Sequence, residues 1–207
     1  FYFLLFTFYF KNMLSNQTFL ITGIADENSL AMKTAEKILQ NNGNVVCTGL
    51  GVTTFHENLS DKAQDFLNKN YADFENSVHK VLGKDIYTAP LDVTLPGSLQ
   101  FLASDLKEKE IQLNGFLHAI AMDKTIRNKS VKPMLEVTAA EFNDTMNVSA
   151  FSLISLCHAL LDNGVLQNGA SIVSLSYNEA EKVSFFPYIN MSIAKAALER
   201  ITIELAD

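Results

Sequence analysis

The stretch TFLITGIADENSLAMKTAEKILQNNGNVVCTG, residues 18–49, holds a strand, a turn, a helix and a second strand. TFLITG and NVVCTG are short apolar runs that end in glycine, as buried strands often do. Between them, apolar residues recur at helical spacing, and the predicted helix ends at Gly43. The predicted helix presents one apolar side, made of Leu30, Ala31, Ala35, Ile38 and Leu39. A unit of this kind predicts two parallel strands joined by a crossover helix.

The same alternation continues along the rest of the chain. Further strands are predicted in DIYTAPLDV, LNGFLHAIA and GASIVSLSY. Helices are predicted around LSDKAQDFLNKNY and ADFENSVHKVL, over LPGSLQFLASDLKEKE, over a long segment from Thr138 to Asp162, and over YINMSIAKAALERITIELAD. This order predicts an α/β fold with a doubly wound parallel sheet of the Rossmann type.

Composition indicates an ordinary globular domain and excludes some functions. The 207 residues are 48% hydrophobic and 19% charged, which is ample material for one core. A net charge of −7 argues against a nucleic-acid partner, because phosphate contacts need a basic surface. Cys47 and Cys157 lie in apolar runs, so we expect buried thiols in a reducing, cytoplasmic compartment. The spacing of His and Cys supports no metal site.

The first ten residues, FYFLLFTFYF, differ from the rest. They are too few to span a bilayer, which takes about 20 apolar residues, and they lack the basic start of a signal peptide. We expect residues 1–12 to be an upstream or non-native extension and 13–207 to be a dinucleotide-binding domain with no membrane partner. The alternative is a shortened signal or anchor segment.

The exit of the first strand is the first place to look for a ligand, because doubly wound sheets bind ligands at the carboxyl ends of their strands. Gly23 allows a tight turn, and Ser29 at the start of the next helix either caps that helix or binds a phosphate oxygen. As a glycine motif this is weak, because G-x-G-x-x-G is absent.

Tyr188 and Lys195 stand seven positions apart in a predicted helix. Seven positions are about two turns, so both side chains project from one face. An ammonium near a phenol favours the phenolate and lowers its pKa. Such pairs also occur on helices with no catalytic role.

Taken in order, TGIADENSLA, LDV, FLHAIA, NVS, SIVSLSY and the Tyr188 and Lys195 pair resemble the short-chain dehydrogenase/reductases. The chain is most similar to their divergent branch, the enoyl-acyl-carrier-protein reductases. That narrower resemblance rests on Ser-Leu-Ala after T-G-I-A, on His118 in FLHAIA, and on Tyr177 where ordinary members have the catalytic serine. It covers residues 18–207.

The resemblance implies catalytic roles for Tyr188, Lys195 and Tyr177. Asp92 and Val93 would contact the adenine, and Lys195 would hold the nicotinamide ribose. The implied cofactor-binding residues are Gly23, Ile24, Ser29, Leu30, Asp92, Val93, Ala119, Ile120, Ala121 and Lys195.

The implied reaction is reduction of an enoyl thioester, carried by acyl carrier protein or CoA, in fatty-acid synthesis. Hydride adds to the β-carbon while a tyrosine hydroxyl stabilises the charge on the thioester oxygen. We expect NADH, because CTGLGVTTF after the second strand holds no cation for a 2′-phosphate. The same segment also lacks an acid for the ribose, so NADPH is not excluded.

Several positions depart from the family pattern and keep alternatives open. Asn147 is typical of ketone-reducing members, and Lys33 and Ala121 replace usual glycines. The gap from Tyr177 to Tyr188 is one residue longer than expected, which leaves Ser174 or Ser176 as substitutes for the ordinary serine. The alternatives are a ketone or alcohol reductase of the 3-oxoacyl type and a non-catalytic nucleotide-binding module.

Two regions lie outside the usual family plan. Residues 52–83 predict an extra helical elaboration at the adenine edge, with no assigned role. The chain stops inside its last predicted helix, so we expect a domain without its C-terminal strands. The resemblance implies a homotetramer built on helices 138–162 and 188–207.

Overall fold

The computed structural model describes residues 13–127, 130–182 and 189–206. The predictions for residues 1–12 and for Tyr188 lie outside these ranges. The chain divides into two compact units. The first comprises residues up to 119 together with 159–173, and the second comprises 120–158 and 174–207.

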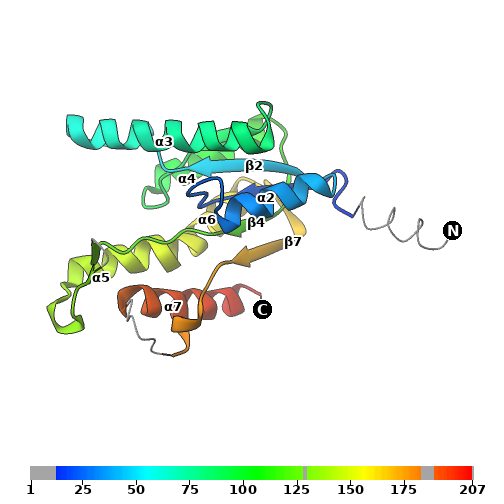
Figure 1. Ribbon diagram of the computed structural model, residues 1–207. Coiled ribbons are helices and arrows are strands. Elements are labelled where there is room, and N and C mark those ends of the chain that lie inside the picture. Colours follow the sequence, from blue (N-terminus) through cyan, green and yellow to red (C-terminus); the bar gives the residue numbers. More distant parts are fainter. Residues whose placement is uncertain (1–12, 128–129, 183–188, 207) are drawn as a thin grey trace. The chain divides into compact units, whose positions relative to one another are not determined.

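The first unit is built on the predicted sheet. Five strands, β1 to β4 and β7, are hydrogen-bonded in the order β3-β2-β1-β4-β7 (Figure 1). Pairing is parallel between β1 and β2, β1 and β4, and β2 and β3. The strands are β1 (Thr18–Ile21), β2 (Asn44–Gly49), β3 (Tyr87–Pro90), β4 (Leu113–His118) and β7 (Leu166–Ser174). The chain reverses direction of winding between β1 and β4, so the doubly wound prediction is confirmed.

Three helices flank the sheet in this unit: α2 (Leu30–Gln40), α3 (Asp61–Leu82) and α4 (Pro96–Glu108). The apolar side of α2 buries Ala31, Met32, Ala35 and Ile38. The prediction that Leu30 belongs to this side is wrong, because its side chain is 71% exposed. Leu30 lies on the helix face of the exposed residues Lys33 and Lys37, whereas Ala31 and Met32 next to it are buried.

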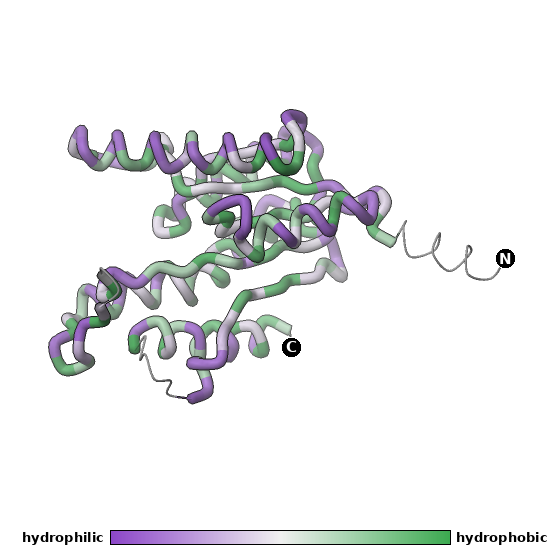
Figure 2. Tube along the Cα trace, in the orientation of Figure 1, coloured by the Kyte–Doolittle hydropathy of each residue, from purple (hydrophilic) through white to green (hydrophobic). Residues whose placement is uncertain are grey.

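The predicted elaboration after β2 is a single helix, α3, whose hydrophilic and hydrophobic turns alternate in Figure 2. Its buried residues Leu67, Phe74 and Val78 face the unit. Gly49 lets α3 approach the end of β2, since a Cβ there would lie 2.4 Å from the Phe74 ring. The helix therefore packs directly against the carboxyl end of β2.

The second unit contains the long predicted helix, which is interrupted. The helix consists of α5 (Ala139–Met146), a π-helical turn η2 (Asn147–Phe151) and α6 (Ser152–Asp162), whose last residues belong to the first unit. A capping box between Thr138 and Glu141 begins α5. The final helix is α7 (Ile189–Leu205), which contacts α5 and η2. π-helical turns inside α-helices are frequent at functional sites.

The shorter elements of the second unit surround these helices. A two-stranded antiparallel pair, β5 (Ile126–Arg127) with β6 (Ser130–Val131), follows β4. The 3₁₀ turns are η1 (Met134–Glu136) and η3 (Asn178–Ala180). Within the described ranges, no helix is long and apolar enough to cross a membrane.

A cavity of about 490 Å³ opens in the first unit at the amino-terminal ends of the strands. Thr18, Asn44 and Tyr87, the first residues of β1, β2 and β3, are among its lining. Dinucleotides bind at the opposite, carboxyl ends of such strands. This cavity therefore lies at the edge opposite to the predicted ligand site.

Candidate functional site

The turn after β1 has the backbone shape that the sequence predicts. Gly23 has a φ of 75°, in the left-handed region that favours glycine. Just before it, Thr22 is fully buried and its Oγ1 donates to the carbonyl of Leu117 at 2.8 Å. The N–H of Ala119 donates back to the same Oγ1 at 3.4 Å. Thr22 thus joins the exits of β1 and β4 at the switch point, a role that sequence reasoning missed.

Ser29 serves as the N-cap of α2. Its Oγ accepts from the N–H of Met32 at 3.3 Å and donates to the carbonyl of Asp26 at 2.8 Å. Of the two roles predicted for Ser29, capping is therefore present. The first turn of α2 carries no acidic side chain, so its positive dipole end is not offset from within the helix. Ile24 is buried in the turn, whereas Leu30 is exposed beside it.

The α3 helix also reaches this turn. Lys80 Nζ on α3 lies 2.7 Å from a carboxylate oxygen of Glu27. Glu27 is an acidic residue within TGIADENSLA, and its charge would otherwise oppose a pyrophosphate. Both side chains are largely exposed, so the pair adds little stability, but it offsets a negative charge at the turn.

Asp92 and Val93 are half-buried just beyond β3. The N–H of Asp92 donates to Ser98 Oγ at 3.1 Å, and its Oδ1 accepts from the N–H and the Oγ1 of Thr94 at 2.9 and 2.6 Å. Its second oxygen, Oδ2, lies 3.2 Å from His56 Nε2. The carboxylate at the predicted adenine contact is therefore held by two residues, Thr94 and His56, while Ser98 holds the backbone of Asp92.

In the second unit, Lys195 on α7 is 5% exposed. Its Nζ donates to the carbonyl of Ile120 at 3.1 Å. Burial lowers the pKa of this ammonium to about 8. No carboxylate pairs with Lys195 within the described ranges. An ammonium has three donors, and the one bond it makes among the described residues leaves donors for hydroxyl groups of a ligand. The contact also fixes the strand end at Ile120, while the neighbouring Ala121 is exposed.

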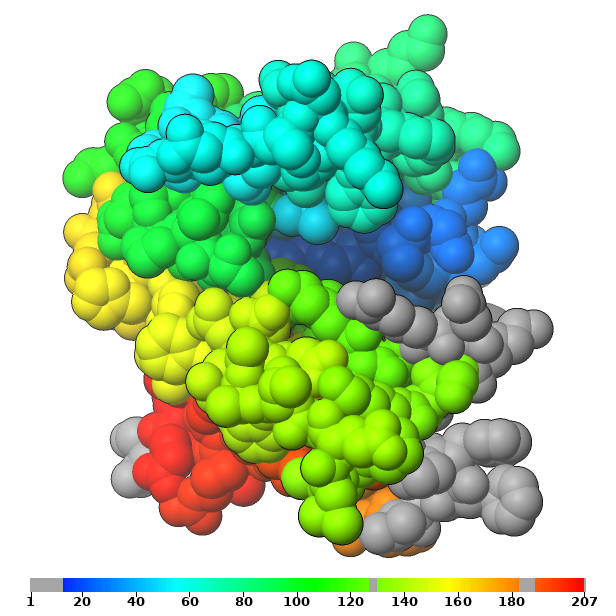
Figure 3. Space-filling view, turned by 90° about the vertical axis from the view of Figure 1, so that its left-hand side faces the viewer, coloured from blue at the N-terminus to red at the C-terminus, as the bar shows by residue number. Residues whose placement is uncertain are grey.

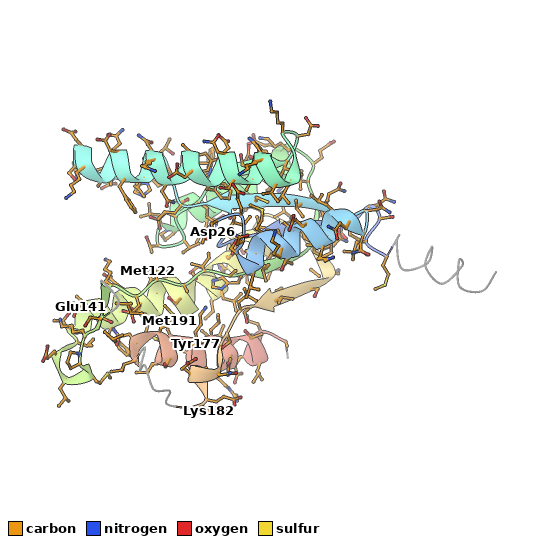
Figure 4. All side chains as sticks on the ribbon, in the orientation of Figure 1. Asp26, Met122, Glu141, Tyr177, Lys182 and Met191 are labelled. Atoms are coloured by element: carbon orange, nitrogen blue, oxygen red, sulfur yellow. The ribbon has the colours of Figure 1, made fainter. Side chains whose placement is uncertain are left out.

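Tyr177 is brought to α7 beside Lys195. Its hydroxyl lies 3.1 Å from Ser192 Oγ, and Ser192 precedes Lys195 by three residues on α7, within one turn. Figure 4 shows Tyr177 on the segment leading to α7. The competing serines meet α7 further along, since Ser174 bonds to Thr202 at 2.8 Å and Ser176 donates to Glu199. The structure thus places Tyr177, rather than either serine, at the Lys195 turn.

Two residues that depart from the family pattern, Lys33 and Asn147, are exposed in the structure. Lys33 pairs with Glu36 at 2.7 Å on the exposed side of α2. Asn147 is exposed and opens the π-helical turn η2. His118 is fully buried, as expected for a packed residue rather than an exposed acid or base. Among the residues that the structure describes, no group of three His, Cys, Asp or Glu side chains is arranged to hold a metal ion.

Ser149 ties η2 to the chain after β4. Its Oγ accepts from the N–H of Met122 at 2.9 Å and donates to the carbonyl of Met122 at 3.1 Å. Both residues lie in the second unit, as do Ile120 and Lys195. The segment from Ile120 to Met122 is therefore fixed at two points.

Comparison with known proteins finds similar sequences. The sequence profile described as Enoyl-(Acyl carrier protein) reductase matches residues 23–207. Enoyl-[acyl-carrier-protein] reductase [NADH] FabI of Rickettsia conorii is 38% identical over 126 residues, covering 58% of this chain and 45% of that protein. FabI of Aquifex aeolicus is 31% identical over 188 residues, covering 90% of this chain and 61% of that protein. The chain thus spans less than two thirds of these relatives.

Solved structures share the fold. The enoyl-(acyl-carrier-protein) reductase of Anaplasma phagocytophilum, in complex with NAD, superimposes with a TM-score of 0.75 at 25% identity, covering 93% of this chain and 65% of that one. The corresponding structure from Aquifex aeolicus gives a TM-score of 0.73 at 28% identity, with coverage of 93% and 67%. With a family profile that matches most of its length, the chain belongs to the enoyl-(acyl carrier protein) reductase family.

Proposed function

We propose that the protein is an NADH-dependent enoyl-acyl-carrier-protein reductase of fatty-acid synthesis. The observation that carries this proposal is the contact between Tyr177 and Ser192, one turn from Lys195. It supplies a tyrosine hydroxyl where ketone-reducing members use a serine. The relatives named as NADH-dependent FabI support the same assignment.

The predicted cofactor-binding residues keep their roles in this proposal. The turn at Gly23 and the N–H groups of α2 receive the pyrophosphate, and Asp92 with Val93 receives the adenine. Lys195 holds the nicotinamide ribose hydroxyls with donors that its bond to Ile120 does not use. The cofactor-binding set thus remains the predicted one, with Ile24, Ser29 and Leu30 shaping the turn and 119–121 forming the strand end.

The chemistry is proposed as follows. NADH, when bound, supplies a hydride for the β-carbon of the enoyl thioester. Negative charge then develops on the thioester oxygen, where hydroxyl donors from Tyr188 and Tyr177 stabilise it. A proton from water then adds to the α-carbon and gives the saturated thioester. Lys195, charged below its pKa of about 8, adds a positive charge that favours this oxyanion.

A ketone or alcohol reductase is the second candidate, and Asn147 favours it. Asn147 is the residue type of ketone-reducing members, and it opens η2. In that reaction Ser174 or Ser176 would replace Tyr177. Both serines are instead hydrogen-bonded to side chains further along α7.

The assembly is proposed to be a homotetramer in the cytoplasm. In this proposal, exposed apolar side chains on the helices of 138–162 and 188–207 form the contacts between subunits. They are Phe151, Leu161, Ile203 and Leu205. The free, buried Cys47 and Cys157 suit a reducing compartment. Sedimentation velocity tests the tetramer, and a monomer at micromolar concentration would contradict it.

Loss of NADH absorbance with crotonyl thioester and, in parallel, acetoacetyl thioester tests the reaction. We expect turnover of the crotonyl substrate, abolished by Tyr188→Phe and strongly reduced by Tyr177→Phe. The matched control is Tyr87→Phe, on β3 in the other unit, which should keep its activity. Turnover of acetoacetyl thioester alone, lost in Ser176→Ala or Ser174→Ala, would establish the ketone reductase. NADH binding without either turnover would favour a binding module.

A further inference from the structure

The loop that links β2 to α3, residues 50–60, is fastened to the start of α4. Its Phe55 ring packs on Gly97, where an added Cβ would lie 2.3 Å from the ring. The same ring lies 6.1 Å from the ring of Phe101, centroid to centroid. Figure 3 shows the loop and α3 region in cyan beside green α4. The next residue of the loop, His56, is thereby carried to the end of β3.

His56 links the loop to Asp92 through its two ring nitrogens. The backbone N–H of Thr53 donates to His56 Nδ1 at 3.1 Å. The Oγ1 and the carbonyl oxygen of Thr53 also lie 3.1 and 3.3 Å from Nδ1. An ionised carboxylate can only accept, so Nε2 carries a proton in its contact with Asp92. That proton is donated to Asp92 Oδ2 across 3.2 Å. The two side chains are only 9% and 17% exposed, so the contact is largely shielded from water.

The carboxylate of Asp92 has one acceptor position left. Its Oδ1 accepts two hydrogen bonds from Thr94, and its Oδ2 accepts one from His56. A carboxylate offers about four acceptor sites. Within the described residues, the second lone pair of Oδ2 is thus open at the carboxyl edge of the sheet. Its direction is set by His56, because the other three positions are already occupied.

We infer that His56 is a positioning residue for cofactor selection: it orients Asp92 so that Oδ2 accepts from the amino group of adenine. The inference rests on the proposed function, in which Asp92 meets the adenine. An exocyclic amine donates a hydrogen bond to a carboxylate. A carbonyl at the same ring position, as in hypoxanthine, is an acceptor and repels it. The loop of the unassigned elaboration therefore contributes to base selection.

The test compares binding of NADH and of reduced nicotinamide hypoxanthine dinucleotide, titrated by fluorescence, in the full chain. The wild type should prefer NADH. In His56→Leu, NADH should bind roughly five- to tenfold more weakly, as for one lost hydrogen bond, while hypoxanthine dinucleotide binding stays unchanged. His56→Gln keeps an N–H donor at about the same reach and should restore much of the preference. His79→Gln, on α3 in the same unit, is the control.

The outcomes separate this inference from the proposed function. Equal weakening of both dinucleotides in His56→Leu would mean a merely structural role and would overturn the inference. An unchanged preference in His56→Leu would overturn it as well, even with crotonyl thioester still reduced. A wild type that binds neither dinucleotide and reduces no thioester would refute the proposed function, and the inference with it. If His56→Leu does not fold, the preference of His56→Gln decides.

Discussion

The buried ammonium of Lys195 should make the stability of the protein depend on pH in a predictable direction. Burial lowers its folded pKa from 10.5 to about 8. Between these values the unfolded state binds more protons than the folded state. The free energy of unfolding should therefore rise as pH increases through this window, and the full penalty applies at pH 7.

The size of the effect follows from the shift. A shift from 10.5 to about 8 corresponds to about 3 kcal/mol at pH 7. Linkage then gives a gain of about 1 kcal/mol between pH 7 and 9, and about 2 to 3 kcal/mol by pH 10. Burial also raises the pKa of Cys47 to about 12 and of Cys157 to about 11, which lowers stability above pH 9. The wild type and a variant at Lys195 share both thiols, so the contribution of the thiols cancels when their free energies of unfolding are subtracted.

Lys195→Met provides that difference, since it keeps an apolar stem and removes the charge. Urea unfolding followed by circular dichroism, at several pH values from 7 to 10, gives both free energies. We expect the free energy of unfolding of the wild type, relative to that of Lys195→Met, to rise by about 1 kcal/mol from pH 7 to 9. Parallel curves across this range would refute the account of a desolvated ammonium. If the free energy of unfolding of Lys195→Met rose with pH relative to the wild type, the predicted sign of the effect would be contradicted.

Three further changes test the first unit. Gly97→Ala should lower the free energy of unfolding by about 1 to 3 kcal/mol, because its Cβ meets Phe55, and the added Phe55→Ala should recover part of the loss. Thr22→Val should cost about 1 to 2 kcal/mol, because two hydrogen bonds at the switch point disappear; a thermal midpoint equal to that of wild type would contradict this. Ser29→Ala should cost about 1 kcal/mol through loss of the α2 cap, and Ser29→Asp should cost less, as compared by urea midpoints.

The sequence predicts the order of strands and helices because each element has a clear apolar period. Leu30 shows the limit of that reasoning, since this apolar side chain lies on the exposed face of α2 with Lys33 and Lys37. The π-helical turn from Asn147 to Phe151 was also not predicted, because the apolar pattern continues through it. Boundaries and local helix geometry depend on tertiary contacts that a single-sequence pattern does not contain.

Among the candidate site residues, resemblance predicts which ones matter but not how they are held. The contact between Tyr177 and Ser192 depends on how the segment after β7 lies along α7, which the spacing of residues does not fix. His56 and Asp92 are 36 positions apart and meet through a loop that the family pattern does not include. The capping role of Ser29, by contrast, follows from its residue type before a helix.

The central claim is reduction of a carbon–carbon double bond, and the position of the transferred hydride tests it most directly. NADH carrying deuterium at the transferable C4 position is supplied with crotonyl thioester, and the product is analysed by mass spectrometry and NMR. The account predicts butyryl thioester with deuterium on the β-carbon, and no label transfer in Tyr188→Phe. The account would be contradicted if crotonyl thioester were recovered unchanged and without label, while an acetoacetyl substrate gave deuterated 3-hydroxybutyryl thioester.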